Sequence, residues 1–206
     1  CSWIDMEIDP KDIVYIRIDR RRKFPVTILF KAFGYSDEDI LNYFYNTDKI
    51  VVQGKRLFKV FQPESLRGQR ASRDIKDPET AEVLVKRGRI ISQRAIARLK
   101  ATGADLIPVD LEDGVIGKAA AHSILHPQSG QVLVRANETL GQEEFDRIQA
   151  AGIDAFEVLI IDGANSSDSI RKTLMLDKIE SKEEALIEIY RRMRPDIVHH
   201  VAMKPV

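Results

Sequence analysis

The chain has 206 residues, of which 44% are hydrophobic and 31% charged, enough to bury the core of one large domain or two small ones. The 32 basic residues balance the 32 acidic ones, whereas a free-standing nucleic-acid binder usually carries a basic excess. A single cysteine excludes an internal disulfide and favours a reducing, cytoplasmic location. No apolar run approaches a membrane span, so no membrane partner is expected. Because the chain starts abruptly and without Met, we expect a piece of a longer protein.

The first elements have the period of β-strands. Apolar and polar residues alternate over residues 4–8 and again over 14–18, which predicts two strands. Between them, Asp9-Pro10-Lys11-Asp12 has proline at the second position of a type I turn, so the strands should form a hairpin. The apolar run Val26–Phe30 predicts a third, more buried strand.

Two helices have clear start signals. Ser36 is an N-cap candidate because three acidic residues follow it and favour a helix start. Ser181 opens a capping box with Glu184, and apolar residues then recur at helical spacing. Pro195 should end this second helix.

The middle of the chain contains an internal repeat. Residues from about 75 to 109 match residues from about 124 to 158 at a constant offset, and each unit has the pattern strand, turn, strand, short helix, glycine, strand. Ser92 should cap the helix of the first unit, and Gly103 and Gly152 occupy the helix-stop positions. The pattern predicts a pseudo-symmetric α+β domain, with a small β-barrel and attached helices as one possible form.

The repeat lies between flanks that do not share it. We therefore predict a discontinuous outer domain of residues 1–46 and 162–206, built from a hairpin, a strand and helices. The inserted domain would span residues 47–161. The loop-forming stretch Gly163–Ser167 marks the second boundary.

Catalytic signatures are absent from the sequence, which has no phosphate-binding loop and no nucleophile elbow. His122 and His126 have i,i+4 spacing, but His126 precedes a proline and no cysteine or carboxylate cluster lies nearby. We therefore expect no catalytic residue and no metal site in this chain. His199 and His200 are interpreted as exposed and inert.

The charged stretch Arg17–Lys23 is the best candidate for function. Trp3, the only tryptophan, lies at the open end of the same predicted hairpin, opposite Asp19. An aromatic face beside arginines suits an unpaired base next to phosphate, and Asp19 can accept a hydrogen bond from a base edge. The alternatives are a solvated turn and a half-buried core tryptophan. A second basic stretch, Lys86–Arg89 with Arg94 and Arg98, is interpreted as a solvated face of the repeat.

The same residues resemble the β subunit of bacterial RNA polymerase. The motifs are Ser2-Trp3-Ile4-Asp5, Asp9-Pro10-Lys11-Asp12, Arg17-Ile18-Asp19-Arg20-Arg21-Arg22-Lys23-Phe24-Pro25 and Gly34-Tyr35-Ser36. Pro63–Gly68 and Lys86–Ile90 resemble an insertion of this family, and Thr173-Leu174 with Ala185–Pro195 resemble the return to its lobe. Cys1 replaces the family's glycine, and residues after Pro195 depart from the pattern.

The resemblance implies a specific role. The lobe is one wall of the downstream-DNA cleft, and Trp3 matches the tryptophan that stacks on a non-template-strand base. Asp19, Arg20, Arg21 and Arg22 would line the same contact. The expected partners are DNA (non-template strand and downstream duplex), the β′, α and σ subunits, and transcription regulators on the insertion. The enzyme is a nucleotidyltransferase whose magnesium belongs to the partner subunit, so no cofactor is expected here.

Two other classes of function stay open. One is a purely structural interaction module, in which Trp3 is buried and the arginines are solvated. The other is a lipoyl- or biotinyl-like carrier domain, because such domains are duplicated small barrels. That class requires a lysine at a hairpin tip, and Lys118 is the candidate.

Overall fold

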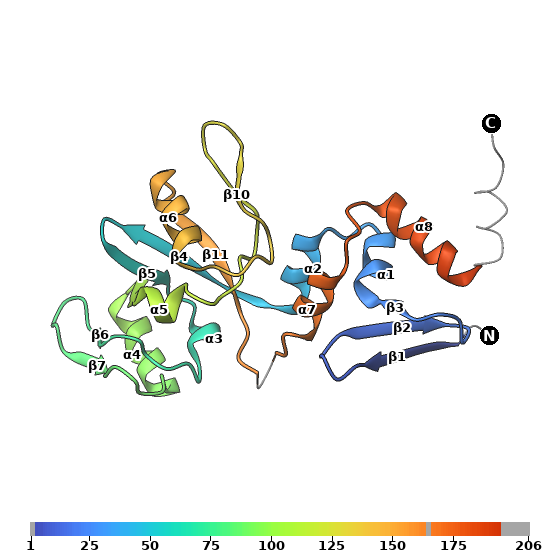
Figure 1. Ribbon diagram of the computed structural model, residues 1–206. Helices are drawn as coiled ribbons and strands as arrows, with labels where there is room; N and C mark the ends of the chain where they lie inside the picture. Colours follow the sequence, from blue (N-terminus) through green and yellow to red (C-terminus); the bar gives the residue numbers. More distant parts are fainter. Residues whose placement is uncertain (1–2, 164–165, 195–206) are drawn as a thin grey trace. The chain divides into compact units, whose positions relative to one another are not determined.

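A computed structural model describes residues 3–163 and 166–194. The chain divides into two compact units, which are described separately (Figure 1). The outer unit comprises Cys1–Phe44 and Ile161–Val206, and the inserted unit comprises Tyr45–Ile160. The predictions for Cys1, for His199 and His200 and for residues 196–206 lie outside the described residues.

The outer unit begins with the predicted hairpin. Strands β1 (Ile4–Ile8) and β2 (Val14–Ile18) pair antiparallel, and β2 also pairs with β3 (Phe24–Pro25). In the turn, the Asp12 amide donates to the Asp9 carbonyl at 3.0 Å, and the Asp9 carboxylate accepts from the amides of Lys11 and Ile13. The hairpin prediction is confirmed.

The strand predicted over Val26–Phe30 is wrong, because the sheet ends at Pro25 and helix α1 (Val26–Ala32) follows. A short apolar run fits a buried strand and a buried helix equally well, so its period could not decide. The tertiary contacts decide it. Thr27 and Lys31 lie one helical turn apart, and both side chains reach the Asp177 carboxylate, at 2.9 and 3.1 Å.

The two helices with start signals form as predicted. Helix α2 (Asp37–Phe44) begins after Ser36, whose hydroxyl accepts from the Asp39 amide at 3.1 Å. Helix α8 (Lys182–Met193) begins after Ser181, whose hydroxyl accepts from the Glu184 amide. A further helix, α7 (Ser169–Leu176), precedes α8.

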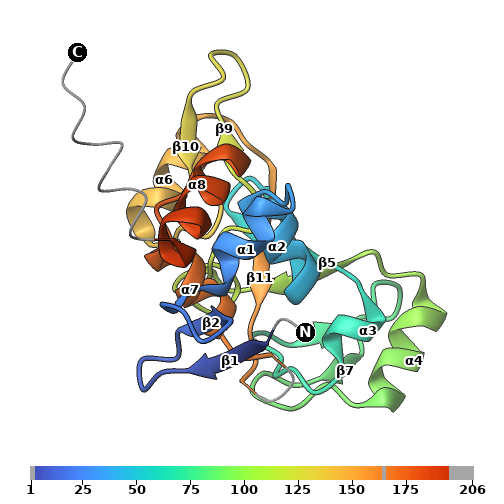
Figure 2. The same ribbon diagram turned by 90° about the vertical axis from the view of Figure 1, so that its right-hand side faces the viewer.

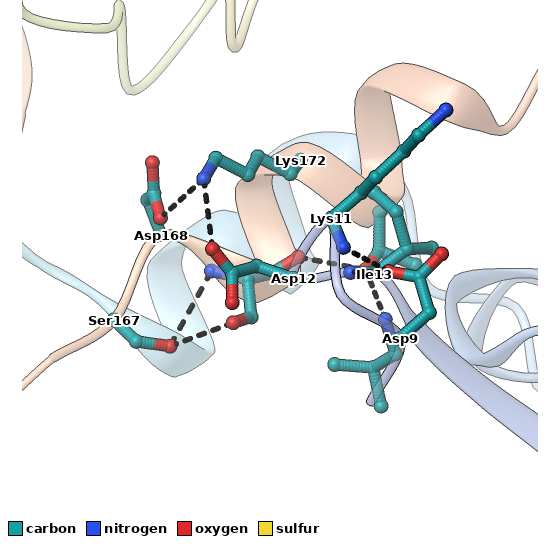
Figure 3. A network of polar contacts seen from close by, with 10 residues as sticks. Asp9, Lys11, Asp12, Ile13, Ser167, Asp168 and Lys172 are labelled. Atoms are coloured by element: carbon teal, nitrogen blue, oxygen red, sulfur yellow. Dashed lines mark hydrogen bonds and ion pairs between the residues drawn. The ribbon is translucent and has the colours of Figure 1, made fainter. Parts of the chain in front are cut away.

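Buried polar contacts join the two chain segments of the outer unit. The Val14 amide donates to the Thr173 hydroxyl at 2.9 Å, and Lys31 and Asp177 form a buried ion pair. At the surface, Lys172 bridges Asp12 and Asp168 at 3.2 and 3.3 Å (Figure 3). These contacts join residues that lie before the insertion to residues that lie after it. The core of the outer unit can therefore form only when both chain segments are present.

The inserted unit is built on an antiparallel sheet in the order β11-β4-β5-β8 (Figure 1). Its strands are β4 (Asn46–Gln53), β5 (Arg56–Val60), β8 (Leu106–Val109) and β11 (Ala155–Ile160). No sheet in the described part of the chain closes on itself. The α+β class is therefore confirmed, and the barrel form does not occur.

Two copies of one motif are attached to this sheet. The first contains β6 (Ile75–Lys76), β7 (Val83–Val85) and α4 (Gln93–Thr102), and it ends in β8. The second contains β9 (Ile124–Leu125), β10 (Val132–Val134) and α6 (Gln142–Ala150), and it ends in β11. Short helices α3 (Pro63–Leu66) and α5 (Leu111–Gly114) precede them. Each strand of the second copy begins 49 residues after the corresponding strand of the first.

The offset extends to individual hydrogen bonds. The Gly88 amide donates to the Ala71 carbonyl at 2.7 Å, and the equivalent Asn137 amide donates to the Ala120 carbonyl at 2.8 Å. Gly88 and Asn137 also share a positive φ, 77° and 72°. The equivalence begins before residue 75, so we define the first repeat as residues 66–109 and the second as residues 115–158.

Two hydrophobic cores form, one in each repeat, and the core of the second repeat also includes Val109 at the end of the first. Figures 1 and 2 show α4 and β7 of the first repeat apart from α6 and β10 of the second. Leu99 of the first core is equivalent to Ile148 of the second, and Ile75 is equivalent to Ile124. Burial at matched positions follows from a shared backbone. In the described residues, no helix is long and apolar enough to cross a membrane.

Candidate nucleic-acid interface

The open end of the β1–β2 hairpin brings Trp3 and Asp19 together. The Asp19 amide donates to the Trp3 carbonyl at 2.8 Å, and the Trp3 amide donates to the Asp19 carboxylate at 3.0 Å. This pair continues the register of the hairpin, in which Ile4 lies opposite Ile18. The backbone of Trp3 is therefore fixed by two hydrogen bonds, while its side chain is 65% exposed.

The chain then reverses in a tight turn at Asp19 and Arg20. Their φ angles are 50° and 59°, and the Arg21 amide donates to the Ile18 carbonyl at 3.0 Å. Two positive φ angles are the pattern of a type I′ turn, which normally prefers asparagine and glycine. Ordinary side chains in this conformation store strain, and such strain often accompanies function.

The other basic residues of the stretch are held by the hairpin. The carboxylate of Glu7 on β1 forms an ion pair with Lys23 at 3.2 Å and a second with Arg17 at 3.4 Å. The hydrogen bond and charge of Lys23 lower the pKa of Glu7 below its ordinary 4.5. The Lys23 ammonium also lies 4.6 Å from the centre of the Tyr15 ring. Arg17 and Lys23 are thus partly neutralised by the protein itself.

Arg20, Arg21 and Arg22 differ from these two, because they are exposed and no ion pair in the described residues involves them. Trp3, Asp19 and the three arginines therefore share one exposed end of the hairpin. An exposed aromatic ring beside unpaired guanidinium groups can stack on a base and contact phosphate oxygens. Asp19 has already used one oxygen on the Trp3 amide, but a carboxylate can accept several hydrogen bonds.

A second exposed aromatic group in the outer unit was not predicted from the sequence. A groove beside helices α1 and α2 is lined by Phe30, Phe33, Tyr35, Tyr43 and Phe44. The signal was available, because five aromatic residues lie within 15 positions of one another. Nothing in the structure shows what covers this groove.

The structure does not bring His122 and His126 to a common ligand. The His122 imidazole contacts the Glu157 carboxylate at 2.8 Å, whereas the ring of His126 accepts from the amides of Gln128 and Ser129. No group of three or more metal-ligating side chains occurs among the described residues.

Comparisons with known proteins identify the relationship. Residues 1–89 match the family model described as RNA polymerase Rpb2, domain 2. The chain is 52% identical over 197 residues to the DNA-directed RNA polymerase subunit beta of Desulfatibacillum aliphaticivorans, covering 94% of the chain and 14% of that relative. It is 57% identical over 194 residues to the subunit of the same name from Geobacter sulfurreducens, with the same coverage.

A third relative extends the match over nearly the whole chain. The subunit beta of Desulfosudis oleivorans is 49% identical, covering 99% of the chain and 16% of the relative. The chain thus spans about one seventh of the length of the relatives it matches. The chain belongs to the family of bacterial RNA polymerase β subunits.

Proposed function

We propose that this segment acts in transcription as one wall of the downstream-DNA cleft of RNA polymerase. The exposed end of the hairpin, formed by Trp3 and Asp19–Arg22, would contact the non-template strand there. The observation that carries the proposal is the Trp3 side chain, which is exposed although its backbone is fixed. The relatives' names support the assignment to the polymerase.

The contribution of this site would be positioning. Stacking of a base on an aromatic side chain is worth about 1–3 kcal/mol, which is enough to bias where one base lies. Arg20, Arg21 and Arg22 would hold the adjoining phosphates, and Asp19 would accept from a base edge. Since the chain has no net charge, it should bind nucleic acid only weakly on its own.

The remaining parts of the enzyme would supply the chemistry. We expect nucleotidyl transfer and the magnesium site to lie outside this segment, with the magnesium in a partner subunit. The segment would work in the cytoplasm, assembled with the β′, α and σ subunits. None of its own residues is assigned a catalytic role.

The inserted unit would serve as a docking surface for transcription regulators. Its separate cores support this role, because a unit that folds on its own core can present a surface without disturbing the outer unit. Asn46 and Ile160 are paired neighbours in the sheet, so its two ends lie side by side. Replacing residues 45–160 with a short flexible linker should therefore preserve basal transcription and remove responses to regulators that dock there.

The two alternative functions lack support in the geometry. The structural-module alternative requires a buried Trp3, but the side chain is exposed. The carrier alternative requires a lysine at a hairpin tip. Lys118 instead lies between Gly117 and the bridge residue Ala119, and its carbonyl accepts from the Leu140 amide at 2.8 Å.

Trp3→Ala in the full-length β subunit, assembled into polymerase, tests the proposal. The readout is open-complex lifetime on promoters that vary the first transcribed non-template base. We expect the lifetime to lose its dependence on that base, and Trp3→Phe to restore part of it. Tyr43→Ala is the matched control, because Tyr43 is also an exposed aromatic of the outer unit. Unchanged base dependence in Trp3→Ala would overturn the stacking role.

A further inference from the structure

The two repeats share one backbone arrangement but carry net charges of opposite sign. Over the matched stretches 66–100 and 115–149, the first repeat has ten basic and four acidic residues, and the second has three basic and four acidic. The excess is absent from the composition as a whole, which is balanced. The basic excess is therefore confined to one of the two equivalent repeats.

The second repeat shows that the fold does not require these charges. At the positions of Arg89 and Arg94 it has Glu138 and Glu143, and at the position of Arg70 it has Ala119. The backbone bonds around these sites are the same in both copies, as for the bridges Arg70–Ile90 and Ala119–Thr139. Since either sign is compatible with the fold, the basic side chains must be explained by what they meet in solution.

Arg94 is placed where a helix disfavours it. It lies in the first turn of α4, which contains no acidic residue, whereas the first turn of α6 contains Glu143 and Glu144. The amino end of a helix carries partial positive charge, so an arginine there opposes folding and a glutamate assists it. A position that works against the stability of its own helix is a candidate for a binding role.

The basic side chains of the first repeat gather near one another. The Arg70 guanidinium donates to the Gly88 carbonyl at 2.9 Å, and Arg73 and Arg87 both contact the Asp110 carboxylate. Asp74 also meets this cluster, but its carboxylate accepts from the Arg87 amide. Basic residues thus outnumber the carboxylates between them. Lys86 and Arg89 flank Arg87 in sequence, and Arg94 lies in the first turn of α4. All three are exposed and, among the described residues, form no ion pair.

The chemistry of the patch indicates its ligand. Most of its members are arginines, whose planar guanidinium groups suit phosphate oxygens. No aromatic residue occurs from Gln62 to Asp105, so the patch has no platform for unpaired bases. Phosphate contacts without stacking are the pattern for a duplex backbone.

We propose that the first repeat of the inserted unit binds the phosphate backbone of double-stranded nucleic acid, through Arg70, Lys86, Arg87, Arg89 and Arg94. The proposal rests on the assignment of the segment to RNA polymerase, which holds duplex DNA, but it concerns a different unit from the Trp3 site. The interpretation of Lys86–Arg89, Arg94 and Arg98 as a solvated face of the repeat is the alternative that the test below separates from this proposal.

The test is the double variant Arg89→Glu/Arg94→Glu in the full-length β subunit, assembled into polymerase. Both changes introduce the residue that the second repeat already has at that position, so folding should be retained. The readout is binding to a mixed-sequence duplex without a promoter, over a series of salt concentrations. Removing each phosphate-binding side chain should make the slope of log affinity against log salt shallower by about one unit.

Arg135→Glu/Arg147→Glu is the control, because it makes the same charge change on the second repeat. It should leave the slope unchanged, and so should Trp3→Ala, which separates this proposal from the Trp3 site. An unchanged slope in the Arg89→Glu/Arg94→Glu variant would overturn the proposal. An equally shallow slope in the control would also overturn it, by showing a general effect of net charge. Polyglutamate that competes as well as duplex would identify an acidic protein as the partner instead.

Discussion

The inserted unit contains two copies of one motif, and their differences separate what the fold needs from what it tolerates. Buried positions are hydrophobic in both copies, as Leu99 and Ile148 are. Exposed positions can carry opposite charges in the two copies, as Arg89 and Glu138 do. The internal duplication therefore acts as a natural control, because one copy shows which residues of the other are optional.

The largest expected effect tests whether each repeat depends on its own core. Leu99→Ala and Ile148→Ala should each lower the free energy of unfolding by about 2–5 kcal/mol, because both side chains are fully buried. Urea unfolding of the chain measures the change, with the exposed Lys100→Ala and Gln149→Ala as controls. A cost at only one of the two core positions would break the equivalence of the cores.

A smaller effect tests a backbone difference between the copies. Ala81 and Gly130 are equivalent, and both have positive φ, 59° and 71°. Gly130→Ala should cost about 1 kcal/mol, because a Cβ is disfavoured in this conformation. Ala81→Gly should have the opposite sign, since it removes the same strain. Thermal unfolding of the two variants measures both, and equal signs would contradict the strain at Ala81.

The charge difference at the helix starts has a smaller effect on stability. Arg94→Glu should raise the free energy of unfolding by about 0.3–1 kcal/mol, and Glu143→Arg should lower it by a similar amount. Both effects are electrostatic and act at exposed side chains, so added salt should reduce them. Unfolding at low and high ionic strength measures this. A loss of stability in Arg94→Glu would show that the arginine is structural.

The smallest effect comes from the side-chain acceptors that close two equivalent loops, Asp77 in the first repeat and His126 in the second. The Asp77 carboxylate accepts from the amides of Glu79 and Thr80, and these bonds lower its pKa below the ordinary 3.8. With a lowered pKa, the stabilisation is complete above pH 3.8 and is lost only as the pH falls through the folded-state pKa. The loop of the first repeat should therefore stay closed at mildly acidic pH.

The equivalent residue in the second repeat is His126, whose Nδ1 accepts from the amides of Gln128 and Ser129. His126→Ala, which removes this acceptor, should therefore speed amide exchange at Gln128 and Ser129 and leave Glu79 and Thr80 unchanged. Asp77→Ala should do the reverse, and unchanged exchange at Gln128 and Ser129 in His126→Ala would refute the equivalence of the two acceptors.

Local signals in the sequence identified much of the fold. The alternating strands around Asp9–Asp12 and the caps at Ser36, Ser92 and Ser181 all form as predicted. These features depend on residues within a few positions of one another, so the sequence contains all the information they need. The repeat was detectable for a related reason, because matched burial imposes matched residues on both copies.

The candidate site could be predicted only in part from the sequence. Its members followed from the hairpin register, which places Trp3 opposite Asp19. Only the tertiary structure shows that Trp3 is exposed, that the turn at Asp19 and Arg20 is left-handed, and that Glu7 pairs with Lys23. A basic run looks the same in sequence whether its charges are paired or exposed.

The sequence by itself therefore determined the α+β class, the hairpin, the capped helices, the duplication and the family. Only the tertiary structure decided that Val26–Ala32 is a helix, that the sheet stays open, and that Arg73 and Arg87 meet at Asp110. The physical reason is the distance in sequence between the residues whose contacts decide each feature. Caps and turns are set by neighbouring residues, whereas the helix depends on Thr27 and Lys31 meeting Asp177, about 150 positions away.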